Sequence, residues 1–261
     1  MKIAIIGAGN VATHLACALK QVGYPILQIY SHTLQSAQCL GEKLGVPYTN
    51  CVWDITGEAD LYIVAIKDAV LTGFIPELVK GKEKALFVHT AGSMPLDIWK
   101  EWTDHYGVLY PMQTFSKKRE VDFTTIPFFI EAVHEADLAK LERIAADLGS
   151  KYYRVDSEQR KKIHLAAVFA CNFANHMYAL SAEILGKEGI PFSVMESLID
   201  ETARKVHELT PVAAQTGPAV RYDTNVMNRQ LSLLEDEPEM QEIYQKVSDS
   251  IHRLATKQDK I

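Results

Sequence analysis

The sequence predicts an α/β domain with a doubly wound, mostly parallel sheet, followed by an all-helical domain. Three observations lead to this prediction. Apolar runs alternate with segments of helical spacing over residues 1–156, a glycine-rich turn joins the first run to the first helix, and no strand pattern occurs from residue 157 onward. We therefore expect two domains, residues 1–156 and residues 157–261.

The first domain opens with a strand–helix–strand unit. Residues 2–6 form a short apolar run, residues 10–22 have helical spacing, and residues 25–30 return to a β-rich composition. A helix over residues 35–44 follows. Later strands are expected over residues 61–66, 85–89, 107–110, 128–131 and 152–155, and later helices over residues 69–79, 96–102 and 135–148. This alternation predicts a parallel sheet that is covered on both faces.

The second domain is expected to contain only helices. Residues 157–185 form one long helical candidate, and prolines separate three or four further segments, at Pro191, Pro211, Pro218 and Pro238. Because most positions of the long candidate are apolar, we expect this helix to be largely buried.

Composition excludes several classes of partner. The chain has 261 residues and a formal net charge of −6, which opposes a nucleic-acid-binding surface. No apolar run approaches the ~20 residues that cross a bilayer, and residues 1–2 lead directly into a strand pattern. We expect a cytoplasmic protein without a membrane partner.

The cysteines and histidines do not predict a metal site. Neither residue type occurs at a metal-binding spacing, and the sequence favours buried, inert thiols for Cys17, Cys39, Cys51 and Cys171.

The turn after the first strand carries the most specific pattern of the domain. It reads G-x-G-x-x-A from Gly7 to Ala12, between a strand and a helix. Gly7 allows the tight turn, Gly9 lets the backbone approach a pyrophosphate, and Ala12 allows close packing, which together form the dinucleotide fingerprint of a Rossmann domain. The predicted cofactor contacts of this turn are Gly7, Ala8, Gly9, Asn10 and Val11.

The end of the second strand favours NADP(H) over NAD(H). An NAD enzyme usually has Asp or Glu there, whereas the sequence has Ser31, His32 and Thr33, about 24 residues after Gly7. Hydroxyl and imidazole groups can bind a ribose 2′-phosphate. NAD stays possible, since the alternative, a polar turn that caps the next helix, fits either cofactor.

Two later loops are predicted to line the cofactor because they follow strands at the carboxyl edge of the sheet. Their predicted contacts are Ala65, Ile66, Lys67, Thr90, Ala91 and Gly92. His89, at the end of its strand, either faces the substrate or is satisfied by backbone groups.

A polar stripe crosses the long helical candidate. Four polar residues fall within about 80° of one another, at Lys161, His164, Asn172 and Asn175. Either they bond to other helices or they line a cleft for a polar substrate. In a cleft, His164 could transfer a proton, while Lys161 and Asn172 hold a carbonyl or imine.

A second polar group follows a turn near residue 217. Arg221 could clamp a substrate carboxylate, with Asp223 close by. The alternative is a capped helix with a local ion pair.

With these motifs in place, the chain resembles the superfamily of 6-phosphogluconate dehydrogenase, β-hydroxyacid dehydrogenase and pyrroline-5-carboxylate reductase. It is most similar to a branch described as NADP oxidoreductases, which combine a Rossmann-like domain with an uncharacterised helical C-terminal domain. The resemblance rests on residues 7–12, 30–36, 89–93, 110–115, 164–172 and 217–223.

The resemblance implies a nicotinamide site and a homodimer. The nicotinamide would lie between Thr90, Pro111, Met112 and the helix that carries His164 and Asn172, with Gln113 and Thr114 near the substrate. Dimerisation would use the helical domain, which is expected to resemble the C-terminal domain of 6-phosphogluconate dehydrogenase. Lys161 or His164 would stand where related dehydrogenases keep a catalytic lysine, so the proton donor is left open between them.

The sequence thus predicts an NADP(H)-dependent oxidoreductase that acts on a small carbonyl or imine metabolite bearing a carboxylate or phosphate. The alternative is a non-catalytic sensor or regulatory module that binds NADP(H).

Overall fold

The structure is a computed structural model that describes residues 1–258. The chain divides into two compact units, residues 1–172 and the residues from 173 onward, and each is described by itself.

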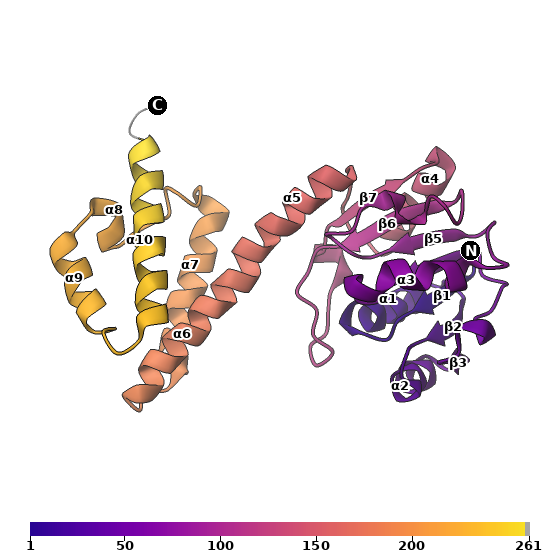
Figure 1. Cartoon of the computed structure of the whole chain (residues 1–261), viewed down its shortest axis with the longest axis horizontal. Coiled ribbons are helices and arrows are strands. Elements are labelled where there is room, and N and C mark those ends of the chain that lie inside the picture. The colour runs from indigo at the N-terminus through magenta and orange to yellow at the C-terminus, as the bar shows by residue number, and fades with distance from the viewer. Residues whose placement is uncertain (259–261) are drawn as a thin grey trace. The chain divides into compact units, whose positions relative to one another are not determined.

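The first unit is built on one eight-stranded sheet, in the order β3-β2-β1-β4-β5-β6-β7-β8 (Figure 1). The strands are β1 Ile3–Ile6, β2 Ile26–Tyr30, β3 Tyr48–Thr49, β4 Leu61–Val64, β5 Leu86–His89, β6 Tyr106–Pro111, β7 Phe128–Ala132 and β8 Tyr152–Arg154. All neighbours pair in parallel except β6 and β7. The order reverses between β1 and β4, so a crevice is expected outside their carboxyl ends.

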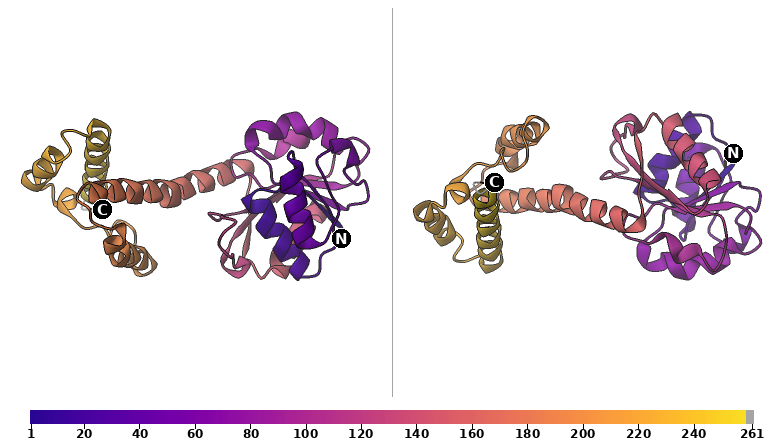
Figure 2. Two further views of the ribbon diagram at one scale, coloured as in Figure 1. Left: turned by 90° about the horizontal axis from the view of Figure 1, so that it is seen from below. Right: turned by 90° about the horizontal axis from the view of Figure 1, so that it is seen from above.

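Helices cover both faces of this sheet (Figure 2). They are α1 Asn10–Gln21, α2 Leu34–Leu44, α3 Asp68–Val79 and α4 Glu135–Asp147, with 3₁₀ turns η1 Val52–Asp54, η2 Leu96–Trp99 and η3 Phe123–Thr125. Side chains alternate along each strand. Ile3 and Ile5 therefore pack with α1, α2 and α4, whereas Ala4 and Ile6 pack with α3 and η2.

The predicted fold class is confirmed, although several short elements were not predicted. The short strand β3 was not predicted, because Tyr48–Thr49 is too short for an apolar pattern. The helix expected over residues 96–102 is the 3₁₀ turn η2, Leu96–Trp99.

A long helix leads out of the first unit. It begins as α5, Ser157–Ala167, continues as a π-helix, η4 Val168–Phe173, and ends as α6, Ala174–Lys187. Ile163 packs against a small cluster formed by Val108, Tyr110 and Phe129, so the start of α5 belongs to the sheet unit.

The second unit has no strand among its described residues. Its other elements are η5 Phe192–Met195, α7 Glu196–Glu208, α8 Pro218–Arg221, α9 Thr224–Ser232 and α10 Pro238–Gln258. Within residues 173–258, the buried apolar side chains are those of Ala219, Met227 and Met240.

The expectation that the long helix is largely buried was wrong for the single chain. Leu165 is 56% exposed, and Met177 and Ile184 are also exposed. Apolar positions are spread around most of this helix, and the single chain covers few of them.

Candidate active site

The turn between β1 and α1 requires glycine at Gly7. Its φ is +120°, and a Cβ placed there would lie 2.3 Å from the carbonyl oxygen of Ala65. The Gly7 amide also donates to the carbonyl of Tyr30 at 2.7 Å, which fixes the turn against β2. The chain is therefore held in a tight bend at the carboxyl edge of the sheet.

The first backbone N–H groups of helix α1 are not capped by a side chain. Gly9 is its N-cap residue, no side chain caps it, and its first turn contains no acidic residue. A Cβ placed on Gly9 would meet no atom within 4 Å, so the backbone here faces open space. Free N–H groups beside an open backbone fit the pyrophosphate of a dinucleotide.

The end of β2 offers groups that could hold a ribose phosphate. Thr33 is the N-cap residue of α2, and no side chain caps that helix either. Thr33 Oγ1 donates to Ser36 Oγ at 2.7 Å, while the side chain of His32 is exposed and Ser31 is half-buried. The uncapped start of α2 thus lies beside the polar side chains of Ser31 and His32. Such groups can bind a 2′-phosphate.

The loops after β4 and β5 are tied to one another. Ser93 Oγ donates to the carboxylate of Asp68, and the amide of Thr90 donates to the carbonyl of Val64 at 3.2 Å. Of the predicted cofactor contacts in these loops, Lys67 is exposed and Gly92 is buried.

His89 occupies a structural position. Its ring is fully buried and stacks on Trp99, with ring centroids 6.5 Å apart. The Ala91 amide donates to Nδ1 at 3.2 Å, so Nε2 carries the proton and lies 3.4 Å from the Pro95 carbonyl oxygen. Burial, with the nearby Arg160, lowers the pKa of His89 to about 3. The placement favours the backbone-satisfied alternative over contact with a substrate.

A cavity of about 390 Å³ opens beside the carboxyl end of β6. Tyr110 and Met112, next to the predicted cofactor contact Pro111, line one side together with Gln113 and Thr114. His164 and Asn172 line the other side. The structure therefore brings two predicted catalytic residues and two predicted substrate residues to one cavity within the first unit.

Inside this cavity, Tyr110 and His164 are hydrogen-bonded. The phenol oxygen lies 3.0 Å from Nδ1, and the two rings meet edge to face. Burial raises the pKa of Tyr110, so the phenol stays neutral. A Cβ placed on Gly92 would lie 2.7 Å from Nδ1 of His164. The predicted cofactor loop therefore passes so close to the His164 ring that a side chain at residue 92 would clash with it.

The π-helix η4 forms part of the cavity wall. Val168, Cys171 and Asn172 all lie on it, and all three line the cavity. A π-turn adds a residue to each hydrogen-bonded loop, which changes the direction of the side chains that follow, and such turns are frequent at functional sites. This π-turn was not predicted from the sequence.

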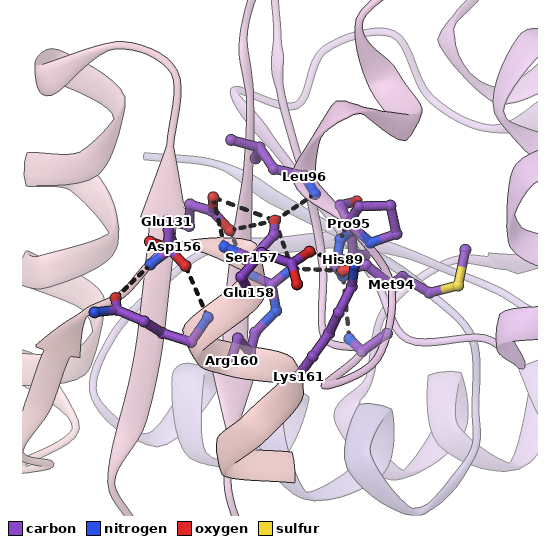
Figure 3. A network of polar contacts seen from close by, with 12 residues as sticks. His89, Met94, Pro95, Leu96, Glu131, Asp156, Ser157, Glu158, Arg160 and Lys161 are labelled. Atoms are coloured by element: carbon purple, nitrogen blue, oxygen red, sulfur yellow. Dashed lines mark hydrogen bonds and ion pairs between the residues drawn. The ribbon is translucent and has the colours of Figure 1, made fainter. Parts of the chain in front are cut away.

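A buried ion pair anchors the first turn of α5 (Figure 3). Arg160 is fully buried and donates to the carboxylate of Glu131, to the carbonyl of Met94 and to Ser157 Oγ. Ser157 also donates to Glu131, through its amide at 3.0 Å and its hydroxyl at 2.9 Å. The network ties α5 to β7 one turn before His164.

Asp156 caps the same helix in a capping box with Gln159, since each side chain accepts from the other residue's backbone amide, at 2.7 and 3.0 Å. Sequence reasoning missed Arg160 and Glu131, because their pairing joins residues far apart in the chain.

The remaining predicted site residues lie outside this cavity. Lys161 is paired with Glu158 on the same helix at 2.7 Å and does not line the cavity. Asn175, Arg221 and Asp223 belong to the second unit. Asp223 accepts the amide of Val226 at 3.2 Å and so caps α9, whereas Arg221 forms no ion pair with any residue in the range 1–258.

The loop between β6 and β7 is attached to α1. Asn10 Nδ2 donates to the Phe115 carbonyl at 2.8 Å, and His14 Nε2 lies 2.9 Å from the Ser116 carbonyl oxygen. The rings of His14 and Phe115 also stack, with centroids 5.8 Å apart. The segment that supplies Gln113 and Thr114 to the cavity is therefore attached to the fingerprint helix.

The thiols differ from their prediction. Cys39 and Cys171 are exposed, and Cys17 and Cys51 are half-buried, so the expectation of buried thiols was wrong. Apolar neighbours in sequence do not show which way a side chain faces: Cys51 precedes η1, and Cys171 lines the cavity.

In the part of the chain that the structure describes, no three His, Cys, Asp or Glu side chains gather as metal ligands would. None of the helices within residues 1–258 combines the length and the apolar character of a membrane span.

Comparison with known proteins agrees with this geometry. The model of the Rossmann-like domain matches residues 1–112, and the model of the domain of unknown function DUF2520 matches residues 126–251. The chain is 55% identical to the putative NADP oxidoreductase BF3122 from Bacteroides fragilis, with a TM-score of 0.93 and coverage of 97% of this chain and 98% of that chain. The chain belongs to this NADP oxidoreductase family.

More distant structures share the fold of the family. An imine reductase from Myxococcus stipitatus in complex with NADP⁺ is 18% identical, with a TM-score of 0.67 and coverage of 100% of this chain and 94% of that chain. A 1-pyrroline-5-carboxylate reductase from Streptococcus pyogenes is 17% identical, with a TM-score of 0.65 and coverage of 97% and 98%. No curated protein sequence matches the chain.

Membership of the family confirms three predictions made from the sequence. They are the resemblance to the NADP oxidoreductase branch, the oxidoreductase class and NADP as the cofactor. NAD also occurs within the fold, in a variant of the Myxococcus enzyme that was solved in complex with NAD⁺.

Proposed function

We propose that this protein is an NADP(H)-dependent oxidoreductase that reduces a small carbonyl or imine metabolite bearing a carboxylate or phosphate. The observation that supports this proposal best is the close approach of Gly92 to His164, which leaves no room for a Cβ at residue 92. A loop predicted to line the nicotinamide passes close to an imidazole ring, and that ring lines a cavity of about 390 Å³.

Different residues of the chain would bind different parts of the cofactor. Free amides at the start of α1 would hold the pyrophosphate, and Ser31 and His32 would bind the 2′-phosphate. When bound, the cofactor supplies the hydride, and the protein orients it. We place the nicotinamide beside Thr90, Gly92 and Met112.

Proton transfer and orientation fall to residues of the cavity. His164 would give a proton to the substrate oxygen or nitrogen, and Asn172 would hold that atom by hydrogen bonding. Gln113 and Thr114 would contact the rest of the substrate.

Turnover tests this function directly. Purified protein is mixed with NADPH and a panel of keto acids, cyclic imines and aldehydes, and loss of the reduced-nicotinamide absorbance is followed. We expect oxidation with at least one member of the panel, and a fall in kcat of about 100-fold or more in His164→Gln. His134→Gln, an exposed histidine of the β7–α4 turn, serves as the matched control.

Calorimetric titration with NADPH accompanies this assay. NADPH binding without turnover on any compound would contradict the enzyme and favour a sensor that binds NADP(H). Absence of binding by a folded sample would contradict both functions.

We also propose a homodimer formed through the helical unit. Few apolar side chains are buried within residues 173–258, while Met177, Ile184, Leu198 and Val206 are exposed on α6 and α7. A unit with so thin a core gains stability by covering these side chains, and a second copy supplies a matching apolar surface.

A further inference from the structure

We propose that Tyr110 is a positioning residue that holds His164 by Nδ1, so that Nε2 is the atom that exchanges a proton in the cavity. This inference rests on the proposed function and names a residue that the sequence did not single out for a role. It assigns to a neutral phenol the orienting task that a carboxylate performs in many enzymes.

The geometry leaves one ring nitrogen of His164 for a substrate. Nδ1 lies 3.0 Å from the phenol oxygen of Tyr110. Nε2 forms no hydrogen bond with any residue in the range 1–258, and the ring lines the cavity. Because a hydrogen bond at one ring nitrogen fixes the tautomer and the orientation, the partner of Nδ1 determines what Nε2 can do.

Three elements hold the pair in place. Tyr110 is buried at the end of β6, and His164 lies on α5, whose first turn is fixed by Arg160 and Glu131. Gly92 closes the third side, since its Cβ would lie 2.7 Å from Nδ1 of His164 and 2.9 Å from Cζ of Tyr110. Only glycine leaves room for the two rings at this point.

The charge of the partner matters for an acid that must give up its proton. A carboxylate at Nδ1 would stabilise the imidazolium and make it a weaker acid. Tyr110 is buried, and a neutral phenol can accept a hydrogen bond from Nδ1–H without adding a negative charge. It can therefore orient the ring without the charge that a carboxylate would add.

The proton balance follows from this arrangement. In the imidazolium, Nδ1–H donates to the phenol oxygen and Nε2–H faces the cavity. As the substrate carbon takes the hydride, its oxygen or nitrogen takes the Nε2 proton. His164 is left neutral with its proton on Nδ1, still donating to Tyr110, and a proton from bulk solvent restores Nε2–H for the next turnover.

The tautomer can be measured without any substrate. We expect NMR of isotopically labelled histidine to show the neutral form of His164 with its proton on Nδ1, and to show a shift toward the Nε2–H form in Tyr110→Phe. Signals are assigned by their loss in His164→Gln. An Nε2–H form in the wild type, or the same tautomer in both proteins, overturns the proposal whether or not a substrate has been found.

Kinetics test the same inference through a double-mutant cycle. We expect Tyr110→Phe to lower kcat by about 10- to 100-fold with little change in the KM for NADPH, and Gly92→Ala to lower kcat similarly. In the His164→Gln background, Tyr110→Phe should not lower kcat further, because Tyr110 acts through the imidazole of His164.

The matched control is Tyr153→Phe, an exposed tyrosine of β8, which should keep wild-type kinetics. Equal losses from Tyr110→Phe in both backgrounds would contradict a positioning role. If the wild-type protein shows no turnover, the proposed function is contradicted instead. The NMR result then tests the positioning role of Tyr110 by itself.

Discussion

At the scale of single residues, the contrast between His89 and His164 shows that burial determines whether a histidine is available to a ligand. Both follow plausible patterns in the sequence, but spacing carries no information on which ring is enclosed. His89 is fully buried with both ring nitrogens engaged, whereas His164 lines a cavity. This difference could not be predicted, because it depends on the packing of Trp99 against β5.

Burial of His89 predicts an acid-sensitive fold. Burial lowers the pKa of His89 from an ordinary value of 6.5 to about 3. Between about pH 3 and pH 6.5, His89 is therefore protonated in the unfolded chain and neutral in the folded chain. The stabilisation is complete above about pH 6.5 and is lost as the pH falls toward about 3, by up to about 1.4 kcal/mol per pH unit.

Urea denaturation from about pH 7 to pH 4 should show a shallower acid dependence in His89→Asn than in the wild type. The exposed His134→Asn should keep the wild-type slope. Identical slopes for His89→Asn and the wild type would contradict the assignment.

At the scale of elements, the start of α5 depends on an ion pair that crosses from helix to sheet. Removal of Arg160 leaves the carboxylate of Glu131, which is 15% exposed, without its buried partner. Loss of one partner of a buried pair typically costs about 3–5 kcal/mol. We expect Arg160→Met to lower the free energy of unfolding by this amount, as measured by urea denaturation.

The exposed Lys162→Met, in the same turn, is the control and should change stability little. The double variant Arg160→Met with Glu131→Gln should recover part of the loss, since no unpaired charge remains. An Arg160→Met protein as stable as the wild type would show that the pair does not anchor the helix.

Elements also mark the limit of what patterns reveal. Long strands and helices of the first unit follow from apolar periodicity, and the Gly7 turn follows from the fingerprint. Patterns of this kind do not identify the two-residue strand β3, the 3₁₀ turn η2 or the π-turn at Val168–Phe173. These elements span two, four and six residues, which is too few to show an apolar period of their own.

At the scale of the whole molecule, the sequence predicted a sheet domain followed by helices, since composition and periodicity change along the chain. It did not predict that the helical unit would bury so few of its own apolar side chains. Periodicity shows that a face is apolar, but it does not show which surface covers that face.

The proposed homodimer makes this exposure testable. Leu198 is 61% exposed on α7, and a glutamate at this position would place a charge in an apolar interface. We expect Leu198→Glu to weaken self-association at least about 10-fold in sedimentation experiments. Val133→Glu, at a 47% exposed position of the sheet unit, should assemble like the wild type. A wild-type monomer at micromolar concentration would contradict the dimer.

The bonds from Asn10 and His14 to the loop after β6 have a practical consequence for anyone altering the coenzyme pocket. Asn10 lies in the turn that we propose for the phosphates, and its side-chain amide is bonded to the loop that carries Gln113 and Thr114. On that proposal, we expect replacement of Asn10 to change coenzyme affinity and substrate selectivity together. A variant at Ser31, which holds no such tether, gives the cleaner separation of the two.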